Sequence, residues 1–400
     1  MVLWKKYGLL LGGLGFSHLG NWIYVVALNL FVLHLTGSAA AVAGIYIVGP
    51  IARILTNFVA GSIIDRSNKR KLMIAADIVR GIIVFCLPFM DSIWLIYALL
   101  FCANIASSFF GPSSTYYKTK FVAQHDRKRF NAILGTFNSG SFLIGPAIAG
   151  VLIMSFNTMI TIWVNSFTFF VCALAIYYLP NVDEQVEEKR QSITWQVLKA
   201  DFKVVTAFAR TNRMFIKIFL LFQCTLMIAF ALDSQEVTFI KQDLAASDSL
   251  YGLIVSIAGL GAIVGGIVAA ALTKKISLKS YLGFGMLFTM LFYTAFYASW
   301  NIWIAIVSFI ALGFFMAFSN TGYETFYQNN VPPEMMGRFG SVTSIFQSVL
   351  QVIFTLLLGV FADVFSLQVT AISFGIISIL LASLLFVSIF SKQALHIVKD

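Results

Sequence analysis

Long apolar runs separated by short polar segments cover almost the whole chain. A helix needs about 20 apolar residues to cross the hydrocarbon core of a membrane, whereas the strands of a membrane barrel would alternate over about 10 residues. The continuous runs therefore predict an all-α integral membrane protein with 12 transmembrane helices. The predicted spans are 7–34, 41–64, 72–90, 93–113, 130–154, 158–179, 214–240, 250–272, 280–299, 302–326, 339–363 and 367–390.

The first apolar run resembles a signal peptide in its flanks, because Lys5 and Lys6 precede it and the small residues 38–41 follow it. Its apolar core is too long for a signal peptide, and further spans follow at once. We therefore expect this run to remain in place as the first helix.

The composition excludes a water-soluble protein. Apolar residues make up 59% of the chain and charged residues only 11%, against about 25% charged residues in an ordinary soluble domain. The mean hydropathy is +0.88. The four cysteines lie inside apolar runs, which predicts buried thiols rather than a disulfide framework. They are Cys86, Cys102, Cys172 and Cys224.

The distribution of basic residues predicts the orientation of the chain, whose net charge is +10. Of the 27 Lys and Arg residues, 24 lie on the side of the termini, Lys241 lies on the opposite side, and Arg53 and Arg80 lie within spans. Cytoplasmic loops carry the excess of Lys and Arg, so both termini are predicted to be cytoplasmic. No soluble face gathers these charges, so we expect membrane lipids and no nucleic acid as partners.

The longest polar stretch, 180–213, divides the predicted spans into six plus six. It contains an acidic run and then an amphipathic segment, 193–208, typical of a helix that lies on the membrane surface. We therefore predict an N-terminal six-helix half at 1–179, a cytoplasmic linker with an amphipathic helix at 180–213, and a C-terminal six-helix half at 214–400.

A shift of 209 residues relates the two halves. The residues that coincide after this shift are Val122 with Val331, Arg129 with Arg338, Phe130 with Phe339, and Gly150 with Gly359. The same shift also aligns the ends of the apolar runs. Paired six-helix halves with a site near the middle of the membrane are an architecture of transporters.

The loop after the second span carries a spaced motif, in which Gly61 is followed after three residues by Asp65-Arg66 and then by a basic run at 69–71. This spacing resembles the signature loop of the major facilitator superfamily. The resemblance implies gating roles for Gly61, Asp65, Arg66 and Arg70. Gly61 permits close helix approach, and the Asp65 carboxylate is suited to pairing with a helix N-terminus. The alternative is a loop whose basic residues only set the orientation of the chain in the membrane.

The fifth predicted span contains the pair Gly145-Pro146, followed by Gly150. This segment resembles the antiporter motif of the same superfamily. Pro146 removes a backbone hydrogen bond and bends a helix, while the two glycines permit close packing. The resemblance implies a bent, tightly sealed helix that favours exchange, and the alternative is ordinary helix packing through small residues.

Three further segments, 35–39, 73–77 and 333–338, resemble the branch of the superfamily that holds macrolide-efflux and siderophore-exporter proteins. The resemblance runs from about residue 7 to residue 365 and implies that Arg338 belongs to the gating motifs. Many drug antiporters of the superfamily carry an arginine in the fourth span, which this chain lacks. The resemblance therefore identifies the branch and leaves the substrate open.

Charged residues inside spans are costly, about 2.5–3.5 kcal/mol each at a helix centre, so each needs a reason. Asp77 and Arg80 are three apart in the third span and therefore share one helical face. They are predicted to form an ion pair that is structural or takes part in gating. Arg53 has no opposite charge one turn away, so it needs a carboxylate from another helix or an anionic substrate group.

Three acidic residues are candidates for proton coupling. Asp233 and Glu236 lie one turn apart in the seventh span, and Glu324 lies near the cytoplasmic end of the tenth. Two carboxyl groups close together in a low-dielectric site favour retention of a proton by one of them. The alternative is that the seventh span ends sooner and leaves its two acids in a wet loop, and that Glu324 is a solvated helix end.

His18, Asn21 and Trp22 lie near the middle of the first span and are candidates for lining a substrate cavity, together with Arg53. The alternative for His18 is a core histidine that is hydrogen-bonded to a neighbour. A cavity rich in Phe, Tyr and Met would suit large amphipathic ligands.

These patterns predict a secondary transporter of the major facilitator type, not an enzyme. The resemblance implies export of an amphipathic small molecule of the drug, macrolide or siderophore type by proton antiport with alternating access. We expect a monomer in the bacterial plasma membrane, without cofactor or metal, because the His and Cys residues show no metal-ligand spacing. The alternatives are a lipid or lysolipid translocase of the same fold, with Arg53 and Arg80 as its anion site, and a transport-inactive receptor.

Overall fold

The computed structural model describes residues 2–56, 63–64, 67–182, 195–273, 275–394 and 397–398. Every regular element within these ranges is a helix, and eleven of the helices are long and apolar enough to cross a membrane. The all-α, multi-pass membrane fold predicted from the apolar runs is therefore confirmed. Helix α12 (Leu278–Tyr297) matches the remaining predicted span but is not among the eleven, because Gly, Ser, Thr and Tyr dilute its apolar residues.

The chain forms two compact units. The first contains Met1–Gly37, Val48–Thr194 and Asp248–Ser256, and the second contains Ser38–Ile47, Trp195–Ser247 and Ile257–Asp400. Each unit thus takes the first part of one helix from the opposite half of the sequence, namely the start of α2 (Ala39–Thr56) for the second unit and the start of α11 (Asp248–Leu272) for the first.

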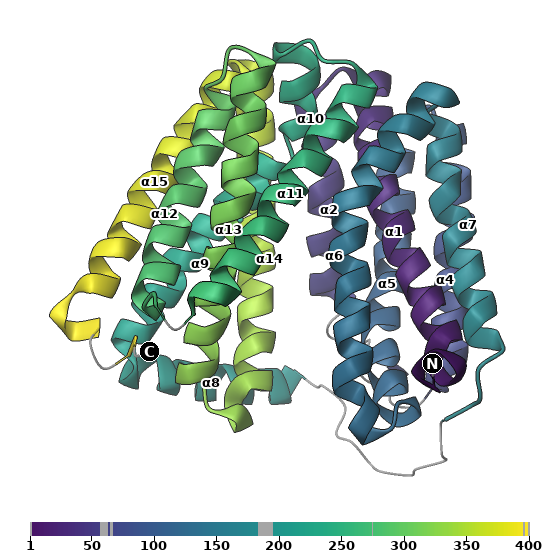
Figure 1. Cartoon of the computed structure of the whole chain (residues 1–400), viewed down its shortest axis with the longest axis horizontal. Coiled ribbons are helices and arrows are strands. Elements are labelled where there is room, and N and C mark those ends of the chain that lie inside the picture. Colours follow the sequence, from purple (N-terminus) through teal and green to yellow (C-terminus); the bar gives the residue numbers. More distant parts are fainter. Residues whose placement is uncertain are drawn as a thin grey trace. The chain divides into compact units, whose positions relative to one another are not determined.

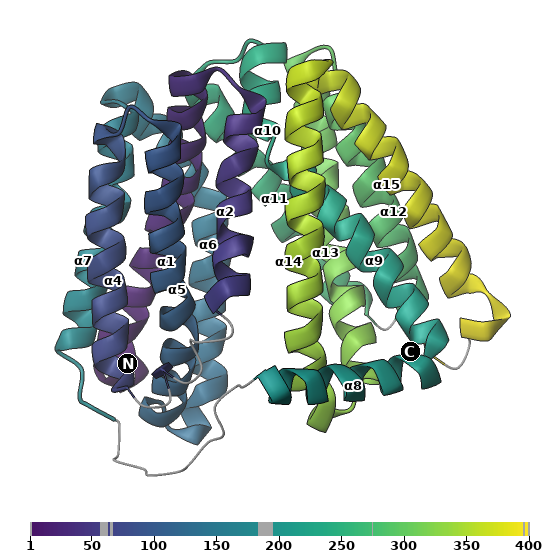
Figure 2. The same ribbon diagram turned by 180° about the vertical axis from the view of Figure 1, so that it is seen from behind.

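The first unit is a bundle of membrane helices that run side by side (Figures 1 and 2). Helix α1 packs against α6 and α7, and α4 packs against α5 and α7. The helices are α1 (Val2–Thr36), α4 (Lys69–Cys86), α5 (Ile93–Phe121), α6 (Gln124–Ser155) and α7 (Thr158–Tyr177), with the short turn η1 (Leu87–Phe89) after α4.

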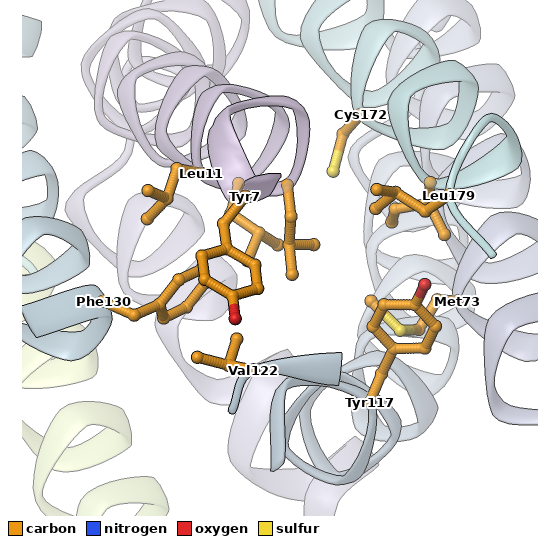
Figure 3. Packing of buried hydrophobic residues seen from close by; sticks show 11 residues of the cluster. Tyr7, Leu11, Met73, Tyr117, Val122, Phe130, Cys172 and Leu179 are labelled. Carbon is orange, nitrogen blue, oxygen red and sulfur yellow. The ribbon is translucent and has the colours of Figure 1, made fainter. Parts of the chain in front are cut away.

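An aromatic cluster closes one end of this bundle. Figure 3 shows the Tyr7 ring against Phe130, with its hydroxyl directed toward Val122. The Tyr7 hydroxyl donates to Asp126 Oδ2 at 3.1 Å and accepts from the Ala123 amide at 3.2 Å. The buried ring therefore keeps its polar group satisfied while it fixes α1 on the start of α6.

The second unit is built in the same way and carries one additional helix, α8 (Trp195–Thr211), which lies across the ends of the membrane helices (Figure 2). Its membrane helices are α9 (Arg213–Asp233), α12, α13 (Ile302–Asn330), α14 (Pro333–Val364) and α15 (Leu367–Phe390), together with the later part of α11. The short elements are α10 (Glu236–Thr238), the π-helical turn η2 (Phe239–Asp243) and η3 (Lys392–Ala394).

The helix boundaries reproduce the repeat predicted from the sequence. Adding 209 to the first residue numbers 39, 69, 93, 124 and 158 of α2, α4, α5, α6 and α7 gives 248, 278, 302, 333 and 367. These are the first residues of α11, α12, α13, α14 and α15. The relation therefore extends over five consecutive helices and does not depend on residue identity.

Several boundaries differ from the prediction. The seventh span was predicted to continue to residue 240, but α9 ends at Asp233, and the Ser234 hydroxyl that follows donates to the Ala231 carbonyl at 2.6 Å. Helices α5 and α13 extend beyond their predicted spans, and α6 and α14 begin before theirs. Apolarity alone did not predict these polar extensions, because backbone hydrogen bonds continue past the apolar run.

Candidate functional site

A break between α9 and α10 brings two acidic side chains together. Asp233 is the last residue of α9 and Glu236 is the first of α10, and Ser234 and Gln235 form the break. Glu236 is only 8% exposed, and Asp233 is half-buried. Although the span ends sooner than predicted, the two acids are therefore not wet loop residues.

Helix α12 of the same unit supplies a hydroxyl donor to this pair. Tyr293 of α12 donates to Glu236 Oε1 at 2.5 Å, and Tyr297, one turn on, donates to the Leu232 carbonyl. The Tyr293 and Tyr297 rings stack with their centroids 5.8 Å apart. The aromatic pair thus fixes both the end of α9 and the carboxyl group that follows it.

The carboxyl groups of Asp233 and Glu236 lie within hydrogen-bonding reach of each other. Within the ranges that the structure describes, neither forms an ion pair with a Lys, Arg or His. An ionised carboxylate only accepts hydrogen bonds, so a hydrogen bond between two carboxyl groups requires a proton on one of them. The arrangement can therefore hold a proton and release it.

The same break also holds the start of α2. Gln235 Nε2 donates to the Ala39 carbonyl at 3.0 Å. From α14, the Asp363 carboxylate accepts from the Ser38 hydroxyl at 2.8 Å and from the Ala39 amide at 3.1 Å. A carboxylate at a helix N-terminus satisfies unpaired amide groups and matches the positive end of the helix dipole.

The first unit contains a buried charge pair of another kind. Asp77 is fully buried in α4 and pairs with Arg80, as their spacing predicts. The Arg80 guanidinium lies between the rings of Phe110 and Phe169, 4.5 Å and 4.4 Å from their centroids. The pair is therefore neutral overall, and aromatic faces stabilise its cation.

The candidates on α1 lie at half-buried positions. The Trp22 ring packs edge-on against Phe142 of α6 at 4.7 Å, and a Cβ atom at Gly145 would lie 2.5 Å from the Trp22 Cβ. Gly145 therefore permits the close approach of α6 to α1 that the antiporter motif implies. His18 and Asn21 are half-buried on the same helix.

The remaining α6 motif residues contact the start of α11. A Cβ atom at Gly150 would lie 2.9 Å from the Ser249 carbonyl oxygen, and one at Gly252 would lie 2.5 Å from the Pro146 carbonyl oxygen. Both contacts lie within the first unit. The glycines and Pro146 thus form a close helix contact.

The structure does not bring all predicted proton-coupling residues together. Glu324 is exposed on α13 and interacts electrostatically with Tyr323 and Tyr327. Tyr327 packs against Phe339 near α8, at the opposite end of the second unit from α10 (Figure 1). Glu324 is therefore separate from the acid pair.

Two candidate cations differ in their surroundings. Arg53 is exposed and forms no ion pair within the described part of the chain. Arg70 donates through Nε to the Ile176 carbonyl at 3.1 Å and also to the Tyr177 carbonyl. Arg70 thus caps the C-terminus of α7, where a cation is favoured.

Four predicted gating residues cannot be placed. Gly61, Asp65 and Arg66 lie outside the described residues, and so does the side chain of Arg338, although its backbone is part of α14.

Several polar contacts in the second unit had not been predicted from the sequence. Gln223 of α9 is fully buried and donates to the Tyr323 hydroxyl at 2.6 Å. A glutamine inside an apolar run was a usable signal for such a contact. Asp363 gave no such signal, because its partners Ser38 and Ala39 are 325 and 324 residues away.

The helices, the repeat and the buried acids together define a multi-pass membrane protein of the transporter class. The family model of the Major Facilitator Superfamily matches residues 10–238 and 234–396, and the chain belongs to this family.

Curated relatives of the chain are bacterial. An uncharacterized MFS-type transporter, YfiS of Bacillus subtilis (strain 168), is 22% identical over 82% of this chain and 80% of its own length. Macrolide efflux protein A of Streptococcus pyogenes is 21% identical over 90% of each chain. The putative bacilysin exporter BacE of Bacillus subtilis is 26% identical over 47% of this chain and 48% of its own length.

Solved structures share the fold. A crystal structure of the nucleoside transporter NupG has a TM-score of 0.74, with 13% identity over 96% of this chain and 99% of that chain. A bacterial homologue of the lysosomal transporter Spinster, in an inward-facing and occupied conformation, has a TM-score of 0.76, with 12% identity over 100% and 99%. The family and its structural neighbours are transporters, which are not enzymes.

Proposed function

We propose that this chain exports an amphipathic small molecule by proton antiport with alternating access, in a bacterial plasma membrane. The observation that carries the proposal is the pair of half-buried Asp233 and buried Glu236, which has a hydroxyl donor and no ion-paired cation within the described ranges. Relatives named as macrolide, bacilysin and multidrug exporters support the direction of transport and the substrate class.

In this proposal the acid pair takes up a proton from the outside. The bias of Lys and Arg toward the termini and their loops supports a position of the α10 end outside the cell. Glu324, at the other end of the second unit, would then release the proton toward the cytoplasm. Each proton transfer would accompany a change in the side to which the transporter opens.

We assign substrate contact to His18, Asn21 and Trp22 on α1 and to Arg53 on α2. We assign gating to Asp65 and Arg66, to Arg70 at the start of α4 and to Pro146 in α6. The paired Asp77 and Arg80 would keep the first unit rigid during the cycle.

A lipid or lysolipid translocase is the second candidate. The exposed Arg53, which has no ionic partner among the described residues, favours it as a site for an anionic group. Arg80 does not favour it, because the guanidinium is already paired with Asp77 and enclosed by two aromatic rings.

The test uses proteoliposomes that contain a pH-sensitive dye and an imposed proton gradient. A macrolide, a cationic dye, a catecholate siderophore and a labelled lysolipid are added in turn. We expect proton flux that depends on one of the first three compounds, and its loss in Asp233→Asn and Glu324→Gln. Asp243→Asn is the control, since it removes an exposed carboxylate. Unchanged flux in both variants would refute the assignment, and movement of lysolipid without proton flux would favour the translocase.

A further inference from the structure

Helix α8 covers an apolar cavity in the second unit. The cavity has a volume of about 350 Å³, within the range of about 300–1,000 Å³ that is typical of ligand pockets. Its walls come from α8, α9 and α14. Side chains that line it include Phe202, Val205, Leu220, Phe339, Phe346 and Val349.

The chemistry of this cavity admits only an apolar occupant. Thr343 is the one lining residue with a polar side chain, and its hydroxyl donates to the Phe339 carbonyl of its own helix at 2.8 Å. The lining side chains therefore offer no free hydrogen-bonding group. Phe202, Leu220 and Val349 are 60%, 39% and 41% exposed, so the cavity is accessible from its rim.

A second, basic cavity adjoins the first on the same helix. Its volume is about 570 Å³, and Phe202 lines both cavities. Lys203 and Arg210 contribute its charge and lie two helical turns apart on one face of α8. In the region that the structure describes, neither forms an ion pair.

The other polar groups of the basic cavity are already engaged. The Thr206 hydroxyl donates to the Phe202 carbonyl at 2.7 Å, and the Thr211 hydroxyl donates to the Ala207 carbonyl at 3.1 Å. Only the two cationic groups therefore remain to bind a ligand, and they favour an anion.

We propose that α8, α9 and α14 bind one anionic phospholipid, with an acyl chain in the apolar cavity and the phosphate between Lys203 and Arg210. The apolar walls from α9 and α14 belong to segments that cross the membrane, so an acyl chain reaches them from the hydrocarbon. A basic, amphipathic helix at a membrane surface attracts anionic headgroups. The bound lipid would hold α8 on the ends of the membrane helices, whatever substrate is transported.

The test uses the full-length protein in nanodiscs with a phosphatidylglycerol that carries a photoactivatable diazirine in its acyl chain. We expect crosslinks at 216–220 and 342–349. Labelling of the lipid-facing residues Leu380 and Leu384 on α15, 60% and 56% exposed, serves as an internal reference for contact with bulk lipid.

The double variant Lys203→Gln with Arg210→Gln removes both charges. It should lower the labelling of the apolar cavity, relative to the labelling of α15, by about 25-fold. Each basic side chain near an anionic surface contributes about a factor of five. Lys392→Gln, which removes another exposed charge of the same unit, should leave the ratio unchanged. Val349→Trp should lower labelling by filling the cavity, and a single size-exclusion peak confirms that each variant is folded.

Competition identifies the ligand. Unlabelled phosphatidylglycerol should displace the probe from the apolar cavity, while phosphatidylcholine and soluble glycerol phosphate should not. Equal displacement by phosphatidylcholine, or an unchanged labelling ratio in the double charge variant, would show ordinary lipid contact and overturn the proposal. Displacement by glycerol phosphate would show a site for a free phosphate and overturn the assignment to a lipid.

Discussion

The two sequence repeats share their helix boundaries but carry buried charge in different ways. In the first repeat, Asp77 pairs with Arg80, whose guanidinium lies between two phenylalanine rings. In the second repeat, Asp233 and Glu236 lie together with a tyrosine hydroxyl and no paired cation among the described residues. An ion pair is neutral without a bound proton, whereas two neighbouring carboxyl groups favour the retention of a proton by one of them.

Neither charge cluster has a counterpart in the other repeat. Adding 209 to 77 and 80 gives Met286 and Thr289, and subtracting 209 from 233 and 236 gives Tyr24 and Ala27. The common scaffold therefore does not require either cluster. This difference supports our proposal of a structural role for the ion pair and a role in proton exchange for the acid pair.

The largest expected effect is the loss of one partner of the ion pair. Asp77→Ala would leave the buried Arg80 without its carboxylate, and breaking a buried pair on one side costs about 3–5 kcal/mol. Thermal unfolding in detergent measures the loss. The double variant Asp77→Leu with Arg80→Met should be close to the wild type, since apolar residues of similar size replace the whole pair. Equal destabilisation by the single and double variants would contradict a compensated pair.

The next effect concerns the close helix contacts that both repeats share. Gly150→Ala should destabilise the protein by about 1–3 kcal/mol, because the added Cβ meets the Ser249 carbonyl oxygen at 2.9 Å. Gly359→Ala should do the same, through Ala43 at 2.7 Å. The matched control is Gly140→Ala on α6, where a Cβ meets nothing within 4 Å. If thermal unfolding shows the same loss for all three variants, helix contact is not the cause.

Tyr293→Phe removes the hydroxyl donor of the acid pair. Loss of one hydrogen bond to Glu236 should lower stability by about 1 kcal/mol. A hydroxyl that donates to a carboxylate favours its ionised form, so the variant should retain the proton to higher pH. The pH at which proton-driven transport is half-maximal should therefore rise. Tyr297→Phe, which leaves Glu236 Oε1 with its donor, should leave that pH unchanged. A similar rise in both variants would show that weaker packing of α12, and not the lost hydrogen bond to Glu236, is the cause.

The smallest effect is expected at the start of α2. Asp363→Asn keeps the shape of the side chain but removes its charge from the helix N-terminus, which should cost about 0.3–1 kcal/mol. High salt should reduce the difference between variant and wild type in thermal unfolding. A difference that does not change with salt would show that the charge is not involved.

The sequence was sufficient to predict the fold class, the approximate positions of the spans and the repeat, because long apolar runs and shared spacing are local signals. The pairing of Asp77 with Arg80 was also predictable from a spacing of three residues on one helix. The break after Asp233 was not, since apolar residues continue on both sides of Ser234 and Gln235.

Contacts between distant segments could not be predicted from a local pattern. Tyr293 is 57 residues from Glu236, and only the packing of α12 against the end of α9 brings them together. The separation of Glu324 from the acid pair has the same cause, since chain spacing does not say which end of a bundle two residues share.

We propose that the acid pair, and not the ion pair, exchanges protons during transport. The most direct measurement is the proton flux per substrate molecule in dye-loaded proteoliposomes. Two double variants are compared. The first carries Asp233→Asn and Glu236→Gln, and the second carries Asp77→Leu and Arg80→Met. We expect the first double variant to lose proton flux and the second to retain the wild-type ratio. Retention of proton flux without the acid pair, or its loss with only the ion pair replaced, would refute the assignment of proton exchange to Asp233 and Glu236.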